Sequence, residues 1–146
     1  DRVLDLELAR AGRQGGDVSV AVFDVDGFEA LNEGGGRAAG DDLLREVAAA
    51  LAASVRLVDT VARTGADEFV VVAPGSGGRA VARRVVEAVA ALPGEGSGGV
   101  TLSAGVAHFP ADGTTADELL GEARQALRSA RVAGGGRIAG VDGVEA

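Results

Sequence analysis

The chain contains no cysteine, methionine, tryptophan or tyrosine, and His108 is its only histidine. Without cysteine, disulfide bonds, thiolate metal sites and cysteine nucleophiles are excluded. A single histidine likewise excludes a zinc site built from several histidines. No apolar run approaches the roughly 20 residues that a helix needs to cross a bilayer, and no signal peptide is visible at the start. We therefore expect a domain that makes no contact with a membrane.

Lysine is absent as well, so the 14 basic residues are all arginines, and they face 22 acidic residues. The formal net charge of −8 argues against nucleic-acid binding, which needs a basic surface. It also repels a nucleoside triphosphate, so a ligand of that class would need Mg²⁺ and local arginines. The length of 146 residues fits one domain. We expect a single domain over 1–146, with an N-terminal helix and lead-in over 1–16 and a core over 17–141.

The apolar pattern alternates between helical and strand periodicity. Helical spacing predicts helices over 1–13, 40–55, 79–92 and from a capping box at Thr115 and Glu118 to about 133. A short helix over 27–33 is expected to be broken by the glycines at 34–36. Apolar runs predict strands over 18–25, 58–64, 68–73 and 100–109, with a final edge strand over 137–141. This order predicts an α+β, ferredoxin-like split-βαβ fold, with a mainly antiparallel central sheet flanked by helices as in polymerase palms and nucleotidyl cyclases.

Acidic residues gather at two of the predicted strand ends. The strand over 18–25 ends near Asp24 and Asp26, and the next hairpin presents Asp67 and Glu68 at its tip. Because the two central strands of a split-βαβ sheet are neighbours, these ends are expected to meet. Carboxylates and phosphates are the oxygen ligands that Mg²⁺ prefers. The sequence therefore predicts a metal-dependent nucleotide site that supports in-line attack on phosphorus with loss of pyrophosphate.

Several spaced motifs occur in a fixed order along the chain. A signature reads GADEF at 65–69, and a D-x-D-x-F motif reads DVDGF at 24–28. An Asn-Glu pair at 32–33 precedes GRAAGD at 36–41, and SAGV follows at 103–106. In this order the motifs resemble the GGDEF family of diguanylate cyclases, from about residue 5 to 137. The resemblance implies that two subunits, each holding one GTP, face each other as a homodimer and join the nucleotides into cyclic di-GMP.

The resemblance implies a metal centre at the two acidic strand ends. Asp24, the carbonyl of Val25 and Asp67 would bind Mg²⁺ or Mn²⁺. Asp24, Asp67 and Glu68 would be the catalytic residues, with Glu68 assisting at the metal or at the attacking hydroxyl.

The resemblance also implies contacts to the nucleotide. Asn32 and Asp41 would hydrogen-bond to guanine, which offers N1–H and N2–H₂ as donors. Arg131 would contact the phosphates, and Arg137 is the candidate for a second phosphate contact. A cyclase with adenine preference is disfavoured, because adenine lacks the edge with two donors.

An R-x-x-D motif precedes the signature at the distance that the family's inhibitory product site has. Arg56 and Asp59 would bind cyclic di-GMP there, since a guanidinium can fork onto a phosphate or a guanine edge. The alternative is a plain surface ion pair, which contributes little to stability.

Several positions depart from the family pattern. Ala66 replaces the second glycine in the signature turn with Gly65, and a methyl group there can crowd the nucleotide. Glu29 stands in place of a lysine, Gly135 in place of a phosphate-binding arginine, and Arg124 in place of an aspartate. These departures leave open a degenerate domain that binds GTP or cyclic di-GMP as a regulatory module without turnover. A purely structural dimerisation module is a third hypothesis.

Members of the family usually carry a sensory or receiver domain. We therefore expect such a domain to be fused to this one in the parent protein. The expected location is cytoplasmic, and a membrane-anchored parent protein stays open.

Overall fold

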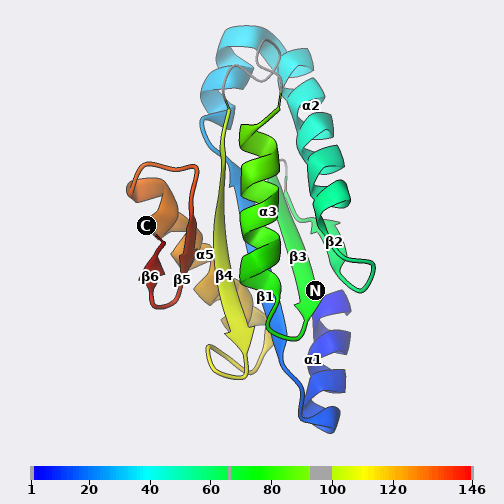
Figure 1. Ribbon diagram of the computed structural model, residues 1–146. Helices are drawn as coiled ribbons and strands as arrows, with labels where there is room; N and C mark the ends of the chain where they lie inside the picture. The colour runs from blue at the N-terminus through cyan, green and yellow to red at the C-terminus, as the bar shows by residue number, and fades with distance from the viewer. Residues whose placement is uncertain (1, 66, 93–99, 146) are drawn as a thin grey trace.

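The computed structural model describes residues 2–65, 67–92 and 100–145, with the backbone alone at 29–32, 35 and 37. Ala66 and the loop expected over 93–99 lie outside these ranges. Helices and strands follow each other as α1 (Arg2–Gln14), β1 (Val18–Val25), α2 (Phe28–Ser54), β2 (Thr60–Arg63), β3 (Glu68–Pro74), α3 (Gly78–Ala90), β4 (Leu102–Phe109), α5 (Ala116–Val132), β5 (Ile138–Gly140) and β6 (Gly143–Val144). Figure 1 shows the resulting α+β arrangement.

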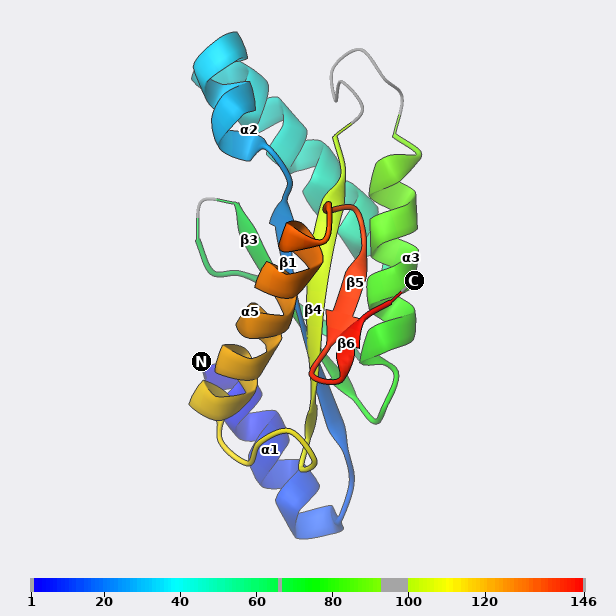
Figure 2. The same cartoon turned by 90° about the vertical axis from the view of Figure 1, so that its left-hand side faces the viewer.

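The strands form one sheet in the order β2-β3-β1-β4-β5-β6, and β4 with β5 is a parallel pair. The other neighbours pair antiparallel. Strands β1 and β3 lie side by side at the centre of the β2-β3-β1-β4 core, which is the split-βαβ order. Helices α2 and α3 cover one face, and α1 and α5 cover the other (Figures 1 and 2). The predicted fold class is confirmed.

Strand β1 is buried on both faces, which explains its nearly continuous apolar sequence. Its side chains alternate between two cores, as strand geometry requires. Ala21, Phe23 and Val25 pack toward α2 and α3. Val18, Val20 and Val22 pack toward α1 and α5. The central strand is thus held from both sides, and its C-terminal end carries Asp24 in a fixed place.

The predicted start of the last long helix is confirmed. The Thr115 hydroxyl accepts a hydrogen bond from the Glu118 amide at 3.1 Å. The Glu118 carboxylate accepts one from the Thr115 amide at 3.2 Å, which completes the capping box. Helix α5 therefore begins at a defined residue and runs beside β1 and β4 with Arg124 and Arg131 along its length.

The predicted interruption at the glycines is confirmed. Within α2 (Phe28–Ser54), Gly36 has φ 82° and ψ 174°, which is not helical, so two helical segments meet there at a kink. One prediction about the elements was wrong: β5 is not the edge strand, because β6 pairs outside it. A strand as short as β6 has little periodicity from which its pairing could be read.

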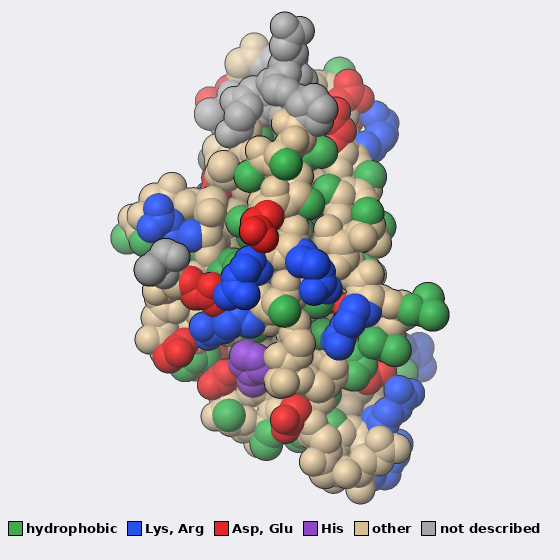
Figure 3. All heavy atoms as spheres, viewed as in Figure 1, with side chains coloured by type: hydrophobic (Ala, Val, Ile, Leu, Met, Phe, Trp, Pro, Cys, Tyr) green, Lys and Arg blue, Asp and Glu red, His purple; other side chains and the backbone are tan. Residues whose placement is uncertain are grey.

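Arginine side chains gather over α3 on the face shown in Figure 3. Arg79 and Arg83 bind acids of the C-terminal segment, with Arg83 Nη2 at 2.7 Å from a Glu145 oxygen. Arg84 donates to the carbonyl of Ser54. These contacts tie α3 to the chain end and to α2. Among the described residues, no helix has the length and apolar character required to cross a membrane.

Candidate functional site

The antiparallel pairing of β1 with β3 places Asp24 directly opposite Glu68. Asp67 precedes Glu68 at the start of β3, so the expected meeting of the acidic strand ends is observed. Side chains that face each other across an antiparallel pair lie within contact distance. The structure therefore brings Asp24, Asp67 and Glu68 to one end of the central strands.

Asp24 is the most perturbed acid of this group. Its Oδ2 accepts a hydrogen bond from Arg131 Nη1 at 2.9 Å, and its Oδ1 is buried with no donor among the described residues. Burial and the adjacent Asp67 carboxyl raise the pKa of Asp24 to about 7, although Arg131 acts in the opposite direction. A hydrogen bond between the Asp24 and Asp67 carboxyl groups needs a proton on one of them, because two ionised carboxylates have none to share.

The raised pKa of Asp24 predicts a pH dependence of stability in the absence of metal. The folded state holds this proton more tightly than the unfolded chain, so its contribution to stability falls as pH rises from 3.8 to about 7. Asp24→Asn removes that contribution. Urea unfolding at about pH 5 and about pH 7.5 in chelator should show the unmodified protein losing more stability than the variant over this interval. Equal losses in both proteins would contradict the raised pKa.

Asp26 has a different environment from Asp24. Its carboxylate accepts hydrogen bonds from the Thr101 hydroxyl at 2.7 Å, the Ser103 hydroxyl at 2.8 Å and the Gly136 amide at 2.9 Å. These donors occupy its oxygens and connect β1, β4 and the loop after α5. Asp26 therefore stabilises the end of β1 through these hydrogen bonds.

Glu68 is turned toward α5. Arg124 donates to both of its oxygens, at 2.8 and 3.3 Å, and the Thr64 hydroxyl donates at 2.6 Å. Burial raises the pKa of Glu68, but these bonds outweigh it and hold that pKa below its usual value. Within the described ranges, no group of three or more acidic or histidine side chains is arranged to hold a metal ion. The carboxylates that converge are those of Asp24 and Asp67.

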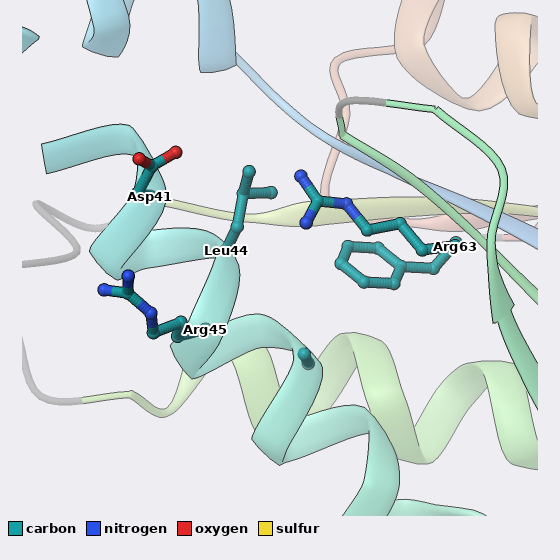
Figure 4. A pocket seen from close by; sticks show the side chains of 6 residues that line it. Asp41, Leu44, Arg45 and Arg63 are labelled. Atoms are coloured by element: carbon teal, nitrogen blue, oxygen red, sulfur yellow. The ribbon is translucent and has the colours of Figure 1, made fainter. Parts of the chain in front are cut away.

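A cavity of about 180 Å³ separates the C-terminal part of α2 from the β2–β3 hairpin (Figure 4). It is lined by Asp41, Leu44, Arg45, Ala48, Arg63 and Phe69. The exposed Asp41 lies on α2 beyond the kink, and the Arg63 guanidinium lies 6.0 Å from the centre of the Phe69 ring. The side chain of Asn32, the other predicted guanine contact, lies outside the described residues.

The two candidate phosphate contacts are in different places. Arg131 contacts Asp24, whereas Arg137 donates to the carbonyl of Gly135 at 3.0 Å and lines another cavity together with Arg83. Gly135 has φ +75°, and a Cβ atom there would lie 3.0 Å from the Asp26 carboxyl group. An arginine at 135 would therefore require a rearrangement of this loop.

Arg56 and Asp59 bind each other. The Arg56 amide donates to Asp59 at 2.8 Å, its guanidinium donates at 3.0 and 3.3 Å, and Nη2 reaches the Pro74 carbonyl at 3.2 Å. Pro74 is at the end of β3 opposite to Glu68. This pair is therefore separated from the Asp24 site by the length of a strand.

Two contacts of the site were not predicted. Thr101 and Ser103 are two residues apart at the start of an apolar strand. Residues at this spacing point to the same face of a sheet, so the sequence could have indicated that both hydroxyls lie on one side. The contact of Arg124 with Glu68 joins residues 56 positions apart and has no local signal.

Comparisons with known proteins agree with the fold and the motifs. Residues 1–137 match the family model "Diguanylate cyclase, GGDEF domain". The diguanylate cyclase DgcP of Pseudomonas aeruginosa is 39% identical over 142 residues, which are 92% of this chain and 21% of that protein. The GGDEF domain of YfiN (TpbB) from the same species has a TM-score of 0.86 at 30% identity, covering 98% of this chain and 91% of that one. The GGDEF domain of DgcB from Caulobacter crescentus, solved with cyclic di-GMP, has a TM-score of 0.83 at 25% identity, covering 97% and 88%. With its family model spanning nearly the whole sequence and its fold shared with these domains, the chain belongs to the GGDEF diguanylate cyclase family.

Proposed function

We propose that this domain is a diguanylate cyclase that binds GTP with Mg²⁺ and condenses two GTP molecules into cyclic di-GMP at a homodimer interface. One observation carries the proposal: Asp24 and Asp67 crowd their carboxyl groups together, and a buried oxygen of Asp24 has no donor among the described residues. A divalent cation satisfies such an oxygen and offsets both charges.

Asp24, Asp67 and the Val25 carbonyl would hold the Mg²⁺ or Mn²⁺ ion. When bound, the ion stabilises negative charge that develops on the phosphate oxygens and on the leaving pyrophosphate. Glu68 would contribute its charge from the neighbouring position. Gly65 and Ala66 are the proposed signature turn before Asp67, and Ala66 lies outside the described residues. The donor set of carboxylates and carbonyl oxygen suits a hard cation.

The remaining residues bind and orient the nucleotide. Asn32 and Asp41 would read the guanine edge, with Asp41 on the wall of the cavity beside α2. Arg131 would exchange its bond to Asp24 for the phosphates, and Arg137 would leave the carbonyl of Gly135 to supply a second phosphate contact. In the reaction, the 3′-hydroxyl of each GTP attacks the α-phosphorus of the other GTP. Two P–O bonds form, the two bonds from α-phosphorus to pyrophosphate break, and two pyrophosphates and the two hydroxyl protons leave.

Regulation is proposed at two levels. The Arg56–Asp59 pair would bind cyclic di-GMP as an inhibitory product site, and the structure of DgcB with this ligand supports the ligand class. The chain spans 21% of the length of DgcP. We infer that residues 1–146 act as one domain of a longer protein in which a fused domain controls dimerisation.

A binding module without turnover is the second candidate. Gly135 favours it, because the second phosphate-binding arginine is missing there and the loop conformation, with its positive φ, suits a glycine. Such a module would retain the cation and guanine contacts but would position the phosphates less firmly.

The deciding experiment is product analysis after incubation of the domain at high concentration with GTP and Mg²⁺. We expect cyclic di-GMP, together with a GTP-dependent rise in melting temperature that ATP does not match. At a ligand concentration of about 100 times Kd, the stabilisation is about 2.7 kcal/mol. A rise without product would favour the binding module. No rise and no product would contradict both candidates and favour a structural module.

A further inference from the structure

Resting on the proposed function, we propose that Arg124 is a positioning residue that restrains Glu68 and thereby limits the affinity of the site for a divalent cation. The ion pair holds the Glu68 carboxylate on the Arg124 side chain of α5. Breaking it would give the cation a third carboxylate.

The contacts of Glu68 support this restraint. Arg124 Nη2 and Nε donate to different oxygens of Glu68, at 2.8 and 3.3 Å. A forked pair of this kind fixes the orientation of a carboxylate as well as its position. The Glu68 side chain is only 22% exposed, so water screens the pair less than it screens a surface salt bridge. The Thr64 hydroxyl adds a third bond on the same side.

Glu68 lies close enough to the proposed cation site to reach it by a side-chain rotation. Glu68 faces Asp24 across β1 and β3, and it follows Asp67 in sequence. Side chains opposite each other in such a pair have Cβ atoms about 4.5–5.5 Å apart. A rotation of the Glu68 side chain is therefore the movement that would bring its charge to the other two carboxylates.

Loss of Arg124 would change the balance of charge around Glu68. Only the neutral Thr64 hydroxyl would then donate to the Glu68 carboxylate, whose charge Arg124 balances in the unmodified protein. A partly buried, ionised carboxylate without a positive partner gains from a cation. The cation and Arg124 thus compete for the same negative charge.

The test uses Mn²⁺ as the probe, with free Mn²⁺ measured by electron paramagnetic resonance in the absence of nucleotide. Arg124→Ala should bind Mn²⁺ about tenfold more tightly than the unmodified protein. A positive charge at ~4–6 Å changes the proton affinity of a carboxylate by about 10- to 1,000-fold, and we take the lower end of that range for the cation. Glu68→Gln and the double variant complete the cycle. The gain should vanish in the Glu68→Gln background, since Arg124 acts through that carboxylate.

The matched control is Arg128→Ala, which removes the same charge from an exposed position one turn further along α5. It should leave Mn²⁺ affinity unchanged. If Arg124→Ala does not fold, Arg124→Gln removes the charge while keeping most of the side chain, and melting curves in chelator identify the folded variants.

Unchanged or weaker Mn²⁺ binding after loss of Arg124 would overturn the inference. The same gain in the Glu68→Gln background would also overturn it, because it would reveal a general effect of charge. Mn²⁺ binding by the unmodified protein, and its loss in Asp24→Asn, test the proposed cation site separately. If only the variant lacking Arg124 bound Mn²⁺, the inference would stand while the proposed activity of the unmodified domain would lose support.

Discussion

Asp24→Asn is expected to reduce the formation of cyclic di-GMP by at least about 100-fold. Loss of a residue that only orients a metal ligand already lowers metal affinity or activity about 10- to 100-fold. Asp24 is the proposed ligand itself, so its loss should have a larger effect. The asparagine still offers an oxygen to Arg131, which donates to Asp24 at 2.9 Å. It also removes one of two crowded negative charges, so the variant should remain folded.

The rate of product formation from GTP and Mg²⁺, followed by chromatography, measures this effect. Asp117→Asn is the matched control, because Asp117 is an exposed acid in the first turn of α5. Its rate should stay within about twofold, since this position lies about two helical turns before Arg124. If Asp24→Asn retained a tenth of the rate or more, Asp24 would not hold the catalytic cation.

Gly105→Ala is expected to destabilise the domain by about 3 kcal/mol or more, at the upper end of the range for overpacked cores. A Cβ atom at 105 would collide with the Ala123 carbonyl and the Leu127 amide, which belong to the backbone of α5. Backbone atoms in a capped helix cannot move aside as the end of a flexible side chain can. Helix α5 would have to lift off β4, and Arg124 and Arg131 would move with it.

Thermal and urea unfolding measure this loss, which corresponds to a fall in Tm of roughly 6 °C or more for a domain of this size. Gly121→Ala provides the control on the same helix. A Cβ atom at 121 meets nothing within 4 Å among the described residues. Because alanine is a better helix former than glycine, that variant should gain about 0.5–1 kcal/mol. A stability for Gly105→Ala within 1 kcal/mol of the unmodified protein would contradict the close approach of α5 to β4.

The local pattern of the sequence was sufficient for most elements and for the family. The continuous apolar run of β1, the helical spacing of Leu4 and Leu8, and the capping box at Thr115 each depend on residues within a few positions of one another. Such patterns show which faces of an element are buried, and the order of the elements then restricts the topology. The meeting of Asp24 with the acids of the hairpin tip followed from that topology alone.

Tertiary structure decided which partner each charged group takes. Arg124 binds Glu68 and Arg131 binds Asp24 because α5 lies close enough to the sheet, an approach that depends on the absence of a side chain at Gly105. Asp24 and Asp26 are two residues apart in one motif, yet one has an oxygen without a donor and the other accepts from three residues. The sequence by itself determined the fold, the family and the candidate residues, since these follow from periodicity and motif order. Only the tertiary structure decided the state of the carboxylates, because burial and hydrogen-bond donors come from segments far away in the chain.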